Sequence, residues 1–236
     1  MKILHRIFTG ALLWIAASAP LQAADMPMTV VELYTSQGCS SCPPADAYLG
    51  KLAARPDVLA LSFHVDYWDY IGWKDTFADP RYTARQRAFS VIFEQRYVYT
   101  PQMVVHGSYQ VVGSDPDVIE DAIEKAREMP SVLVTLTEKD GGYEINLPGT
   151  ANLKDIDVIA VFFDEKHETE IDRGENSGRK IANYNVVRDF KELLRWNGDA
   201  RKIQFKNPHS KGNNCAVILQ SALTGKIVGA AQLANK

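Results

Sequence analysis

The chain has 236 residues and a formal net charge of −3, from 26 Lys and Arg against 29 Asp and Glu. Hydrophobic residues make up 46% of it and charged residues 23%, which is typical of a protein that folds around an apolar core. A mildly acidic chain without a long basic run is a poor partner for nucleic acid or an anionic membrane surface. We therefore expect one large or two small globular domains and no nucleic-acid partner.

The N-terminus has the features of a secretory signal peptide. Lys2 and Arg6 form a basic start, an apolar run covers residues 7–17, and Ala23 precedes a suitable cleavage point. A helix that crosses a bilayer needs about 20 apolar residues, so this run is short for that purpose, although an uncleaved anchor is the alternative. Removing Lys2 and Arg6 takes the charge from −3 to −5 (two fewer positive charges). We expect residues 1–23 to be cleaved, no transmembrane segment to remain, and the mature protein to be secreted or periplasmic.

The chain has three cysteines: Cys39, Cys42 and Cys215. Disulfides persist in the oxidising compartments that exported proteins reach. An odd number leaves one cysteine over, and the spacing in GCSSCPPAD makes Cys39 and Cys42 the natural pair. Cys215 starts an apolar strand and is expected to act as a small buried hydrophobic residue.

The first elements predict two parallel strands joined by a helix. Residues 29–35 (TVVELYT) and 58–65 (VLALSFHV) are rich in β-branched and apolar residues and favour strands. Between them, Ala45, Leu49 and Leu52 have helical spacing. Two such strands connected by a helix form a right-handed βαβ unit.

A second group of elements follows. Asp79-Pro80 and Asp115-Pro116 are start signals for two further helices. Between these helices, QMVVHG and YQVVGS predict a strand pair that turns at Gly107-Ser108. The resulting order, β-α-β-α-β-β-α, is that of a thioredoxin fold, and we assign residues 24–130 to a thioredoxin-like domain.

After Pro130 the pattern becomes rich in strands. Asp140-Gly141-Gly142 predicts a hairpin turn, and further apolar strands follow between polar turns. A helix is conceivable only around residues 187–196. We interpret residues 131–236 as a β-rich, sandwich-like second domain, and the lack of a linker predicts that it packs against the first.

The predicted layout makes Cys39 reactive. It lies where a strand ends and a helix begins, and the helix N-terminus stabilises a thiolate and lowers the pKa of the thiol. Cys42 should lie one turn into the same helix. Attack by Cys39 on a substrate sulfur would give a mixed disulfide, which Cys42 would resolve. The expected substrate is a protein thiol or disulfide, and no cofactor is expected beyond the Cys39–Cys42 disulfide.

Residues elsewhere are expected at the same sheet edge. Thr100-Pro101 precedes the predicted antiparallel strand, so it should meet Cys39; we predict that its peptide bond is cis and that Thr100 holds a substrate strand. Asp66, Tyr67 and Trp68 follow the second strand and could line the substrate groove. The neighbouring His64 is expected to be a hydrogen-bonded core residue instead.

Glu32 shares a strand face with Val30 and Tyr34. Buried carboxylates are rare without a purpose. Glu32 could accept the proton of Cys42 during resolution, or it could be an exposed or salt-bridged strand residue. The pattern favours neither interpretation.

LYTSQGCSSCPPAD, VDYWDYIGWKD, YTARQRAF and YTPQMVVHG together resemble a family of secreted bacterial thioredoxin-like proteins that is catalogued only as a domain of unknown function. The resemblance covers residues 29–125 and continues more loosely through residues 173–187. It implies a thioredoxin fold with a β-rich partner domain in an exported protein, and no particular reaction. The chain is also similar to the wider oxidoreductase superfamily, whose motif roles map onto Cys39, Cys42 and Pro101. Glu32 departs from that pattern, because it lies one residue further from Cys39 than the superfamily's buried acid usually does.

Thiol–disulfide exchange is therefore the favoured function, with two alternatives. Paired thiolates suit Cu(I), so a copper-handling protein is one; zinc usually requires four ligands, and the pair offers two. A non-catalytic binding protein with a structural disulfide is the other. In RGENSGR, Arg173 and Arg179 could bind an anion or a partner, although a solvated turn between strands is the simpler interpretation.

Overall fold

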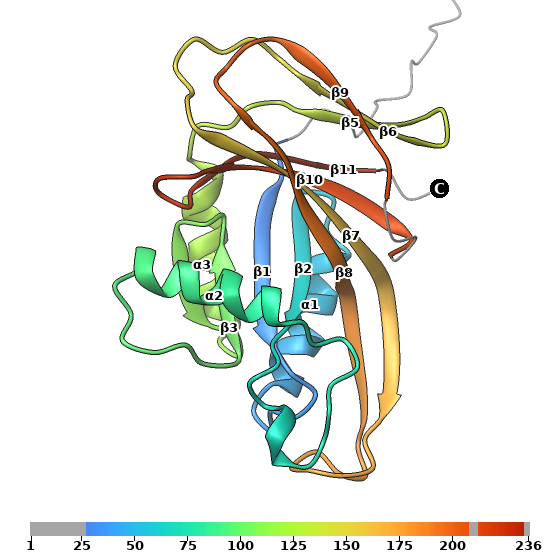
Figure 1. Ribbon diagram of the computed structural model, residues 1–236. Helices are drawn as coiled ribbons and strands as arrows, with labels where there is room; N and C mark the ends of the chain where they lie inside the picture. Colours follow the sequence, from blue (N-terminus) through green and yellow to red (C-terminus); the bar gives the residue numbers. More distant parts are fainter. Residues whose placement is uncertain (1–26, 208–211, 234–236) are drawn as a thin grey trace, which may run out of the picture.

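The computed structural model describes residues 27–207 and 212–233, so the predicted signal peptide at residues 1–23 lies outside the described residues. An eight-stranded mixed sheet with the order β11-β10-β7-β8-β2-β1-β3-β4 runs through the described part of the molecule. A second sheet of three strands, in the order β5-β6-β9, covers one end of it (Figure 1). None of the described helices is long and apolar enough to cross a membrane.

The N-terminal half has the predicted order of elements. It contributes β1 (Thr29–Thr35), α1 (Pro43–Ala53), β2 (Val58–His64), the short 3-10 helix η2 (Asp69–Ile71), α2 (Pro80–Ile92), β3 (Gln102–Val105), β4 (Tyr109–Val112) and α3 (Pro116–Arg127). Strand β1 pairs parallel with β2 and antiparallel with β3, which confirms the βαβ unit and the strand pair that follows it.

The two predicted helix starts have the expected caps. The Asp79 side chain accepts a hydrogen bond from the backbone N–H of Arg81 at the start of α2, and Asp115 accepts one from Val118 at the start of α3. Each aspartate precedes a proline at the first helical position, where proline costs no hydrogen bond. Both starts were therefore visible in the sequence.

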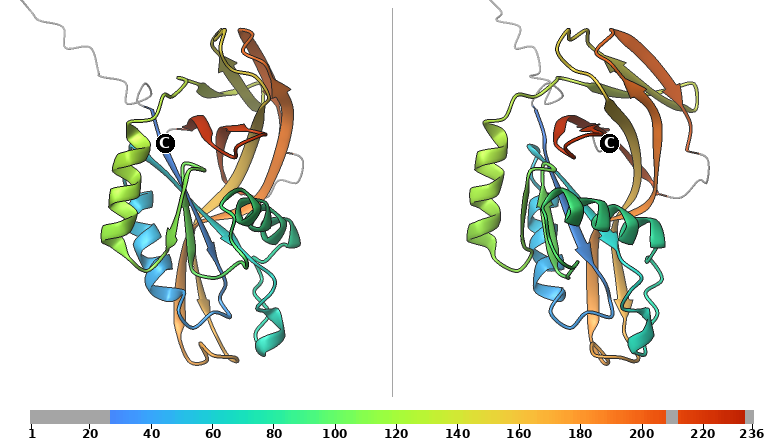
Figure 2. Two further views of the ribbon diagram at one scale, coloured as in Figure 1. Left: turned by 90° about the vertical axis from the view of Figure 1, so that its left-hand side faces the viewer. Right: turned by 60° about the vertical axis from the view of Figure 1, so that its left-hand side comes forward.

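The helices cover the two faces of the sheet. Val31 and Leu33 of β1 pack in a cluster with α1 and α3, whereas Val30 and Tyr34 pack in a second cluster that includes α2 residues. Figure 2 shows α1 and α3 on one side of β1 and α2 on the other. Because successive side chains of a strand point to opposite faces, a shift of one residue along β1 decides which helix a side chain meets.

The C-terminal half continues the same sheet. It contributes β5 (Thr135–Lys139), β6 (Gly142–Leu147), β7 (Ile156–Glu170), β8 (Lys180–Trp196), β9 (Arg201–Phe205), β10 (Asn214–Ser221) and β11 (Ile227–Gln232). Strand β8 pairs parallel with β2 through Ser62 and Val186. Residues 187–196, where a helix was conceivable, form the last part of β8 instead, because they pair along their length with β7.

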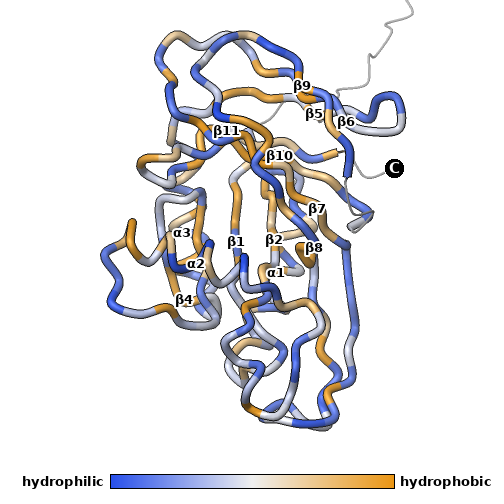
Figure 3. The backbone as a smooth tube through the Cα atoms, in the orientation of Figure 1, coloured by the Kyte–Doolittle hydropathy of each residue, from blue (hydrophilic) through white to orange (hydrophobic). Residues whose placement is uncertain are grey.

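The three-stranded sheet explains the sandwich-like pattern. Leu136 of β5 and Ile145 of β6 pack against Phe162 of β7 and Val217 of β10 in a third apolar cluster. Two sheets therefore face one another in this half, as a sandwich requires, but one of them is an extension of the sheet of the first half. Figure 3 shows hydrophobic segments gathered in the central strands and hydrophilic ones in the connecting loops. A domain boundary at residue 130 stays a prediction.

Candidate functional site

Cys39 and Cys42 form a disulfide with their Cα atoms 5.4 Å apart. Cys42 is the N-cap of α1, and its backbone N–H donates to the carbonyl oxygen of Cys39 at 3.2 Å. The expectation that Cys42 lies one turn into the helix is therefore wrong by about a turn. The physical reason is Pro43-Pro44: proline is favoured in the first helical positions, so the helix begins there and Cys39 lies in the turn before it.

The disulfide is largely covered. Cys39 has a relative exposure of 2% and Cys42 of 0%, while Ser40 and Ser41 between them are exposed. The Ser41 hydroxyl lies 3.4 Å from the Cys39 sulfur, from where it can donate to a thiolate. This donor matters because Pro43 and the next residue lack the N–H groups that a helix N-terminus otherwise presents.

Trp68 connects the cysteine loop to the loop before β3. A Cβ added at Gly38, next to Cys39, would come within 3.3 Å of the Trp68 Cβ. The Trp68 indole N–H donates to the Thr100 hydroxyl oxygen at 2.7 Å, and the Thr100–Pro101 peptide bond is cis, as predicted. Trp68 thus lies between the CxxC turn and the Thr100-Pro101 loop, and both loops belong to one site.

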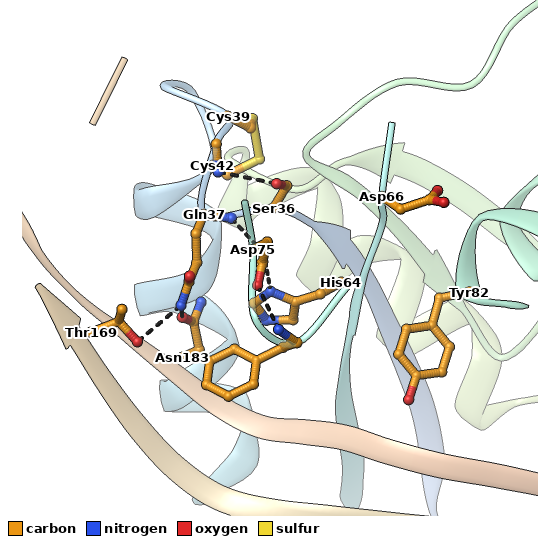
Figure 4. Close-up of polar contacts among 12 residues, drawn as sticks. Ser36, Gln37, Cys39, Cys42, His64, Asp66, Asp75, Tyr82, Thr169 and Asn183 are labelled. Atoms are coloured by element: carbon orange, nitrogen blue, oxygen red, sulfur yellow. Dashed lines mark hydrogen bonds and ion pairs between the residues drawn. A yellow bond between two sulfur atoms is a disulfide. The ribbon is translucent and has the colours of Figure 1, made fainter. Parts of the chain in front are cut away.

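Asp66 and Tyr67 both contact α2. Asp66 accepts a hydrogen bond from the Thr83 hydroxyl of α2 at 2.6 Å, and Figure 4 shows it well apart from the disulfide. The Tyr67 hydroxyl donates to the side-chain oxygen of Gln86, also on α2, at 3.1 Å. The Tyr67 hydroxyl also interacts with the Thr100 side chain. Of the three residues predicted to line a groove, Trp68 contacts both the cysteine loop and Thr100, and Tyr67 contacts Thr100.

Glu32 forms an ion pair within the core. It is fully buried, Arg85 of α2 donates to both of its carboxylate oxygens at 2.6 and 2.7 Å, and the Tyr34 hydroxyl donates to it at 2.8 Å. Although burial alone lowers the pKa of Arg85, Glu32 raises it. Glu32 faces α2, whereas Leu33, one residue closer to Cys39, faces α1. The structure therefore shows the salt-bridged strand residue, and it does not place Glu32 on the face of α1 and the cysteines.

The connection between β7 and β8 holds the cysteine loop in place. Asn176 is fully buried, and its side-chain amide donates to the carbonyl oxygens of Gln37 and Cys39 at 2.9 Å each. Arg179 donates to the Asn176 side-chain oxygen, and Arg173 is exposed. The segment RGENSGR is thus a turn, but one whose central asparagine contacts the cysteine loop across 137 residues of sequence.

Gln37 is the second anchor of this loop. Its side-chain amide donates to the Thr169 hydroxyl at 3.0 Å and lies 3.4 Å from the Asn183 oxygen. Thr169 and Asn183 belong to β7 and β8, which together form a long hairpin. Its side-chain oxygen accepts from the Trp73 indole, and its backbone N–H donates to Asp75 at 2.8 Å. Figure 4 shows Gln37 reaching from the cysteine loop to the hairpin, with Asp75 and His64 beside it.

His64 is a buried, hydrogen-bonded core residue, as expected. Its Nδ1 lies 2.7 Å from an Asp75 carboxylate oxygen. Burial alone lowers the pKa of His64, but the Asp75 carboxylate acts in the opposite direction and the net pKa is raised. Conversely, burial alone raises the pKa of Asp75, but His64 and two backbone N–H groups bring it below its ordinary value. The arrangement therefore favours an imidazolium paired with a carboxylate.

The sequence analysis missed Asp46. It lies on α1 four residues after Cys42, in the motif GCSSCPPAD, and has a relative exposure of 2%. Burial raises the pKa of Asp46 to about 7. The available signal was its position: residues i and i+4 of a helix share a face. The signal is ambiguous, because acidic residues are common in the first turn of exposed helices.

Cys215 lies away from this site. It is fully buried in the apolar cluster between the two sheets, and burial raises the pKa of its thiol to about 12. It therefore behaves as the small hydrophobic residue that was expected. Within residues 27–207 and 212–233, no group of three or more His, Cys, Asp and Glu side chains is arranged to hold a metal ion.

The fold and the site together define a mixed α/β protein with a buried disulfide in the turn that precedes α1. The chain belongs to the family described as "Protein of unknown function (DUF1223)", whose model matches residues 30–220. No curated protein matches the chain.

Two solved structures are similar to this chain. A crystal structure of a protein from Agrobacterium tumefaciens is 32% identical, with a TM-score of 0.79 over 90% of this chain and 96% of that one. HBP35 of Porphyromonas gingivalis is 14% identical, with a TM-score of 0.62 over 89% of this chain and 75% of that one. The second likeness concerns the fold alone.

Proposed function

We propose that this protein is an exported thiol–disulfide oxidoreductase with a thioredoxin-like fold, which exchanges the Cys39–Cys42 disulfide with thiols or disulfides of other proteins. One observation carries the proposal. The CxxC disulfide precedes a helix, and Trp68 joins its turn to the Thr100-Pro101 loop. An extended substrate segment beside Thr100 would bring a substrate sulfur toward Cys39.

The reaction follows from this placement. In the reduced protein, the Cys39 thiolate is stabilised by the helix dipole of α1 and by the Ser41 hydroxyl. It attacks a substrate disulfide, one substrate thiolate leaves, and a mixed disulfide forms. Cys42 then displaces the second substrate thiolate and restores the Cys39–Cys42 bond. The protein loses two electrons and the substrate gains them; the reverse sequence would oxidise a substrate dithiol.

The test uses the mature chain with defined mixtures of reduced and oxidised glutathione. An oxidoreductase gives a defined midpoint and turns over insulin or a small disulfide, and Cys39→Ala abolishes the turnover. Cys42→Ala should accumulate a mixed disulfide with the physiological partner, which mass spectrometry can identify. Cys215→Ala is the matched control, because it removes the third thiol without touching the pair.

A structural disulfide in a non-catalytic binding protein is the second candidate, and the burial of Cys39 favours it. Structural disulfides have potentials below about −300 mV and resist the glutathione pool. In that case glutathione would not reduce the pair. Cys39→Ala would lower the melting temperature, and neither the parent protein nor the variant would turn over a disulfide substrate. The same titration therefore separates the two candidates.

A further inference from the structure

The hairpin of β7 and β8 continues past the strands that flank it. Strand β10 pairs with β7 only as far as Phe163, and the pairing of β8 with β2 is at Val186. Strands β7 and β8 nevertheless pair with each other out to Glu170 and Lys180. Within the described residues, the outer part of the hairpin (residues 164–186) is therefore a two-stranded ribbon. Such a ribbon has little stability of its own, so its contacts with the rest of the molecule decide how firmly it is held.

The two strands of this ribbon are each held in place. The ring of Tyr184 on β8 packs so closely against Gly50 of α1 that a Cβ added there would come within 2.7 Å of it. On β7, the Thr169 hydroxyl accepts a hydrogen bond from the Gln37 side chain at 3.0 Å. These contacts fix the paired strands, so a movement of the hairpin near the cysteines is confined to its tip, residues 172–179.

The tip contacts the cysteine turn through Asn176. This side chain has a relative exposure of 0%, although every other residue of the tip is exposed. Its amide donates to the carbonyl oxygens of Gln37 and Cys39 at 2.9 Å each. A segment with an exposed backbone and few buried contacts opens more easily than the core of a protein. The tip is therefore the part of the hairpin that can leave the cysteine turn while the sheet stays intact.

The loop that follows β2 encloses the cysteine turn together with the tip. Trp68 of this loop packs beside Gly38, next to Cys39, and a Cβ added at Gly174 of the tip would come within 3.2 Å of the Trp73 Cβ. Figure 1 shows the end of the β7–β8 hairpin beside the short helix of this loop. Cys39 is left with a relative exposure of 2%. Because an attacking thiol must reach its sulfur, the turn has to part from one of these covers before exchange begins.

We propose that the tip is a lid on the cysteine turn, which Asn176 holds closed and which opens before a thiol reaches Cys39. This inference deepens the proposed function and rests on it, since a lid has a purpose only over a disulfide that exchanges. Gly174 and Gly178 lie on either side of Asn176 with φ values of +77° and +79°. A Cβ added at Gly178 would meet nothing within 4 Å, so the tip has room to turn there.

A lid differs from an anchor that fixes the geometry of the disulfide. Asn176 donates to backbone carbonyl oxygens and to neither sulfur, so its bonds can form whether the cysteines are oxidised or reduced. A lid that closes equally over both forms slows reduction and reoxidation by the same factor and leaves the midpoint potential unchanged. An anchor would favour one redox form and shift the midpoint.

The experiment measures both rates on the mature chain. Dithiothreitol gives two electrons to the Cys39–Cys42 disulfide and becomes a cyclic disulfide, and an excess of that cyclic disulfide drives the reverse reaction. Asn176→Ala should raise both rates by about tenfold, because losing two hydrogen bonds favours the open tip, and should leave the midpoint in dithiothreitol buffers unchanged. Tyr48→Phe is the matched control: it loses a hydrogen bond to Glu120 of α3 and leaves the tip intact, so neither rate should change.

Unchanged rates in Asn176→Ala would overturn the proposal, and so would an equal acceleration in Tyr48→Phe, which would indicate general loosening. A faster reduction with a shifted midpoint and no faster reoxidation would show an anchor instead of a lid. A protein that fails to turn over insulin, but in which Asn176→Ala speeds both reactions, would disprove the proposed catalysis and leave the lid standing. Insulin turnover with unchanged Asn176→Ala rates would do the reverse.

A second measurement needs no variant. In the unmodified protein, NMR should show the side-chain amide protons of Asn176 exchanging with water far faster than the backbone amide protons of β1, because the tip opens while the sheet stays intact. Exchange as slow as that of β1 would mean that the tip leaves the cysteine turn only when the whole protein unfolds, which would contradict the proposal.

Discussion

Each of the two sheet faces beside β1 buries one acidic side chain, and the two acids have different interaction partners. Glu32, on the α2 face, receives three hydrogen bonds from Arg85 and Tyr34. Asp46, on the α1 face, has a relative exposure of 2% and interacts with the uncharged side chains of Thr35 and Asn183 and with the charge of His64. Glu32 is bonded directly to a guanidinium cation, whereas no guanidinium is bonded to Asp46 and burial raises the pKa of its carboxyl group to about 7. Burial alone therefore does not set the protonation state of an acid; its partners do.

The largest test of this comparison removes the partner of Glu32. Arg85→Ala leaves a buried carboxylate without its cation and should lower the free energy of unfolding by about 3–5 kcal/mol. Urea unfolding of the mature chain measures it. The control is Lys125→Ala, which breaks an exposed i,i+4 pair with Asp121 and should change stability by about 0.5 kcal/mol or less. An Arg85→Ala effect no larger than that of the control would show that the two faces do not differ in this way.

A second test concerns the pH dependence of stability on the Asp46 face. The folded-state pKa of about 7 lies above the ordinary value of 3.8, so the folded protein binds the proton more tightly than the unfolded chain. The stability associated with protonated Asp46 is complete below the ordinary value and is lost as pH rises through about 7. At higher pH the buried charge costs on the order of 4 kcal/mol, since each pKa unit corresponds to about 1.4 kcal/mol.

Asp46→Asn should therefore be more stable than the parent protein at about pH 8, and the advantage should shrink as the pH falls toward about 5. Denaturant midpoints across this range measure the difference, with Asp117→Asn as the exposed control. A constant difference between Asp46→Asn and the parent at all pH values would mean that Asp46 does not titrate in the folded protein.

A smaller effect is expected where the long hairpin contacts the site. Asn176→Ala removes the donor to the carbonyl oxygens of Gln37 and Cys39, and an unsatisfied buried acceptor costs about 1–3 kcal/mol. The released turn should also let small thiols reduce the disulfide faster. Ser177→Ala, next to it on the exposed side, is the control. If Asn176→Ala matches the control in both stability and reduction rate, the hairpin does not hold the cysteine loop.

Much of the N-terminal half could be predicted because its signals are local. Asp79-Pro80 and Asp115-Pro116 start helices through contacts within one turn. Two prolines after Cys42 mark the start of α1 in the same way, although the sequence analysis placed Cys42 one turn inside that helix. Thr100–Pro101 could be predicted because Cys39 and Pro101 belong to elements whose order alone sets which sheet edge they share. Alternation along β1 placed Glu32 on the face of Val30 and Tyr34 but left open whether it is buried or exposed.

Tertiary structure decided which partners meet at the site. Glu32 finds Arg85 across 53 residues, and Cys39 meets Asn176 across 137; no short-range pattern encodes either contact. A one-residue offset on β1 sends Glu32 to α2 instead of α1, and the pairing of β8 with β2 brings the hairpin to the cysteine loop. The physical reason is that capping and periodicity act within a few residues, whereas the protonation of a buried acid depends on every group that the fold packs around it.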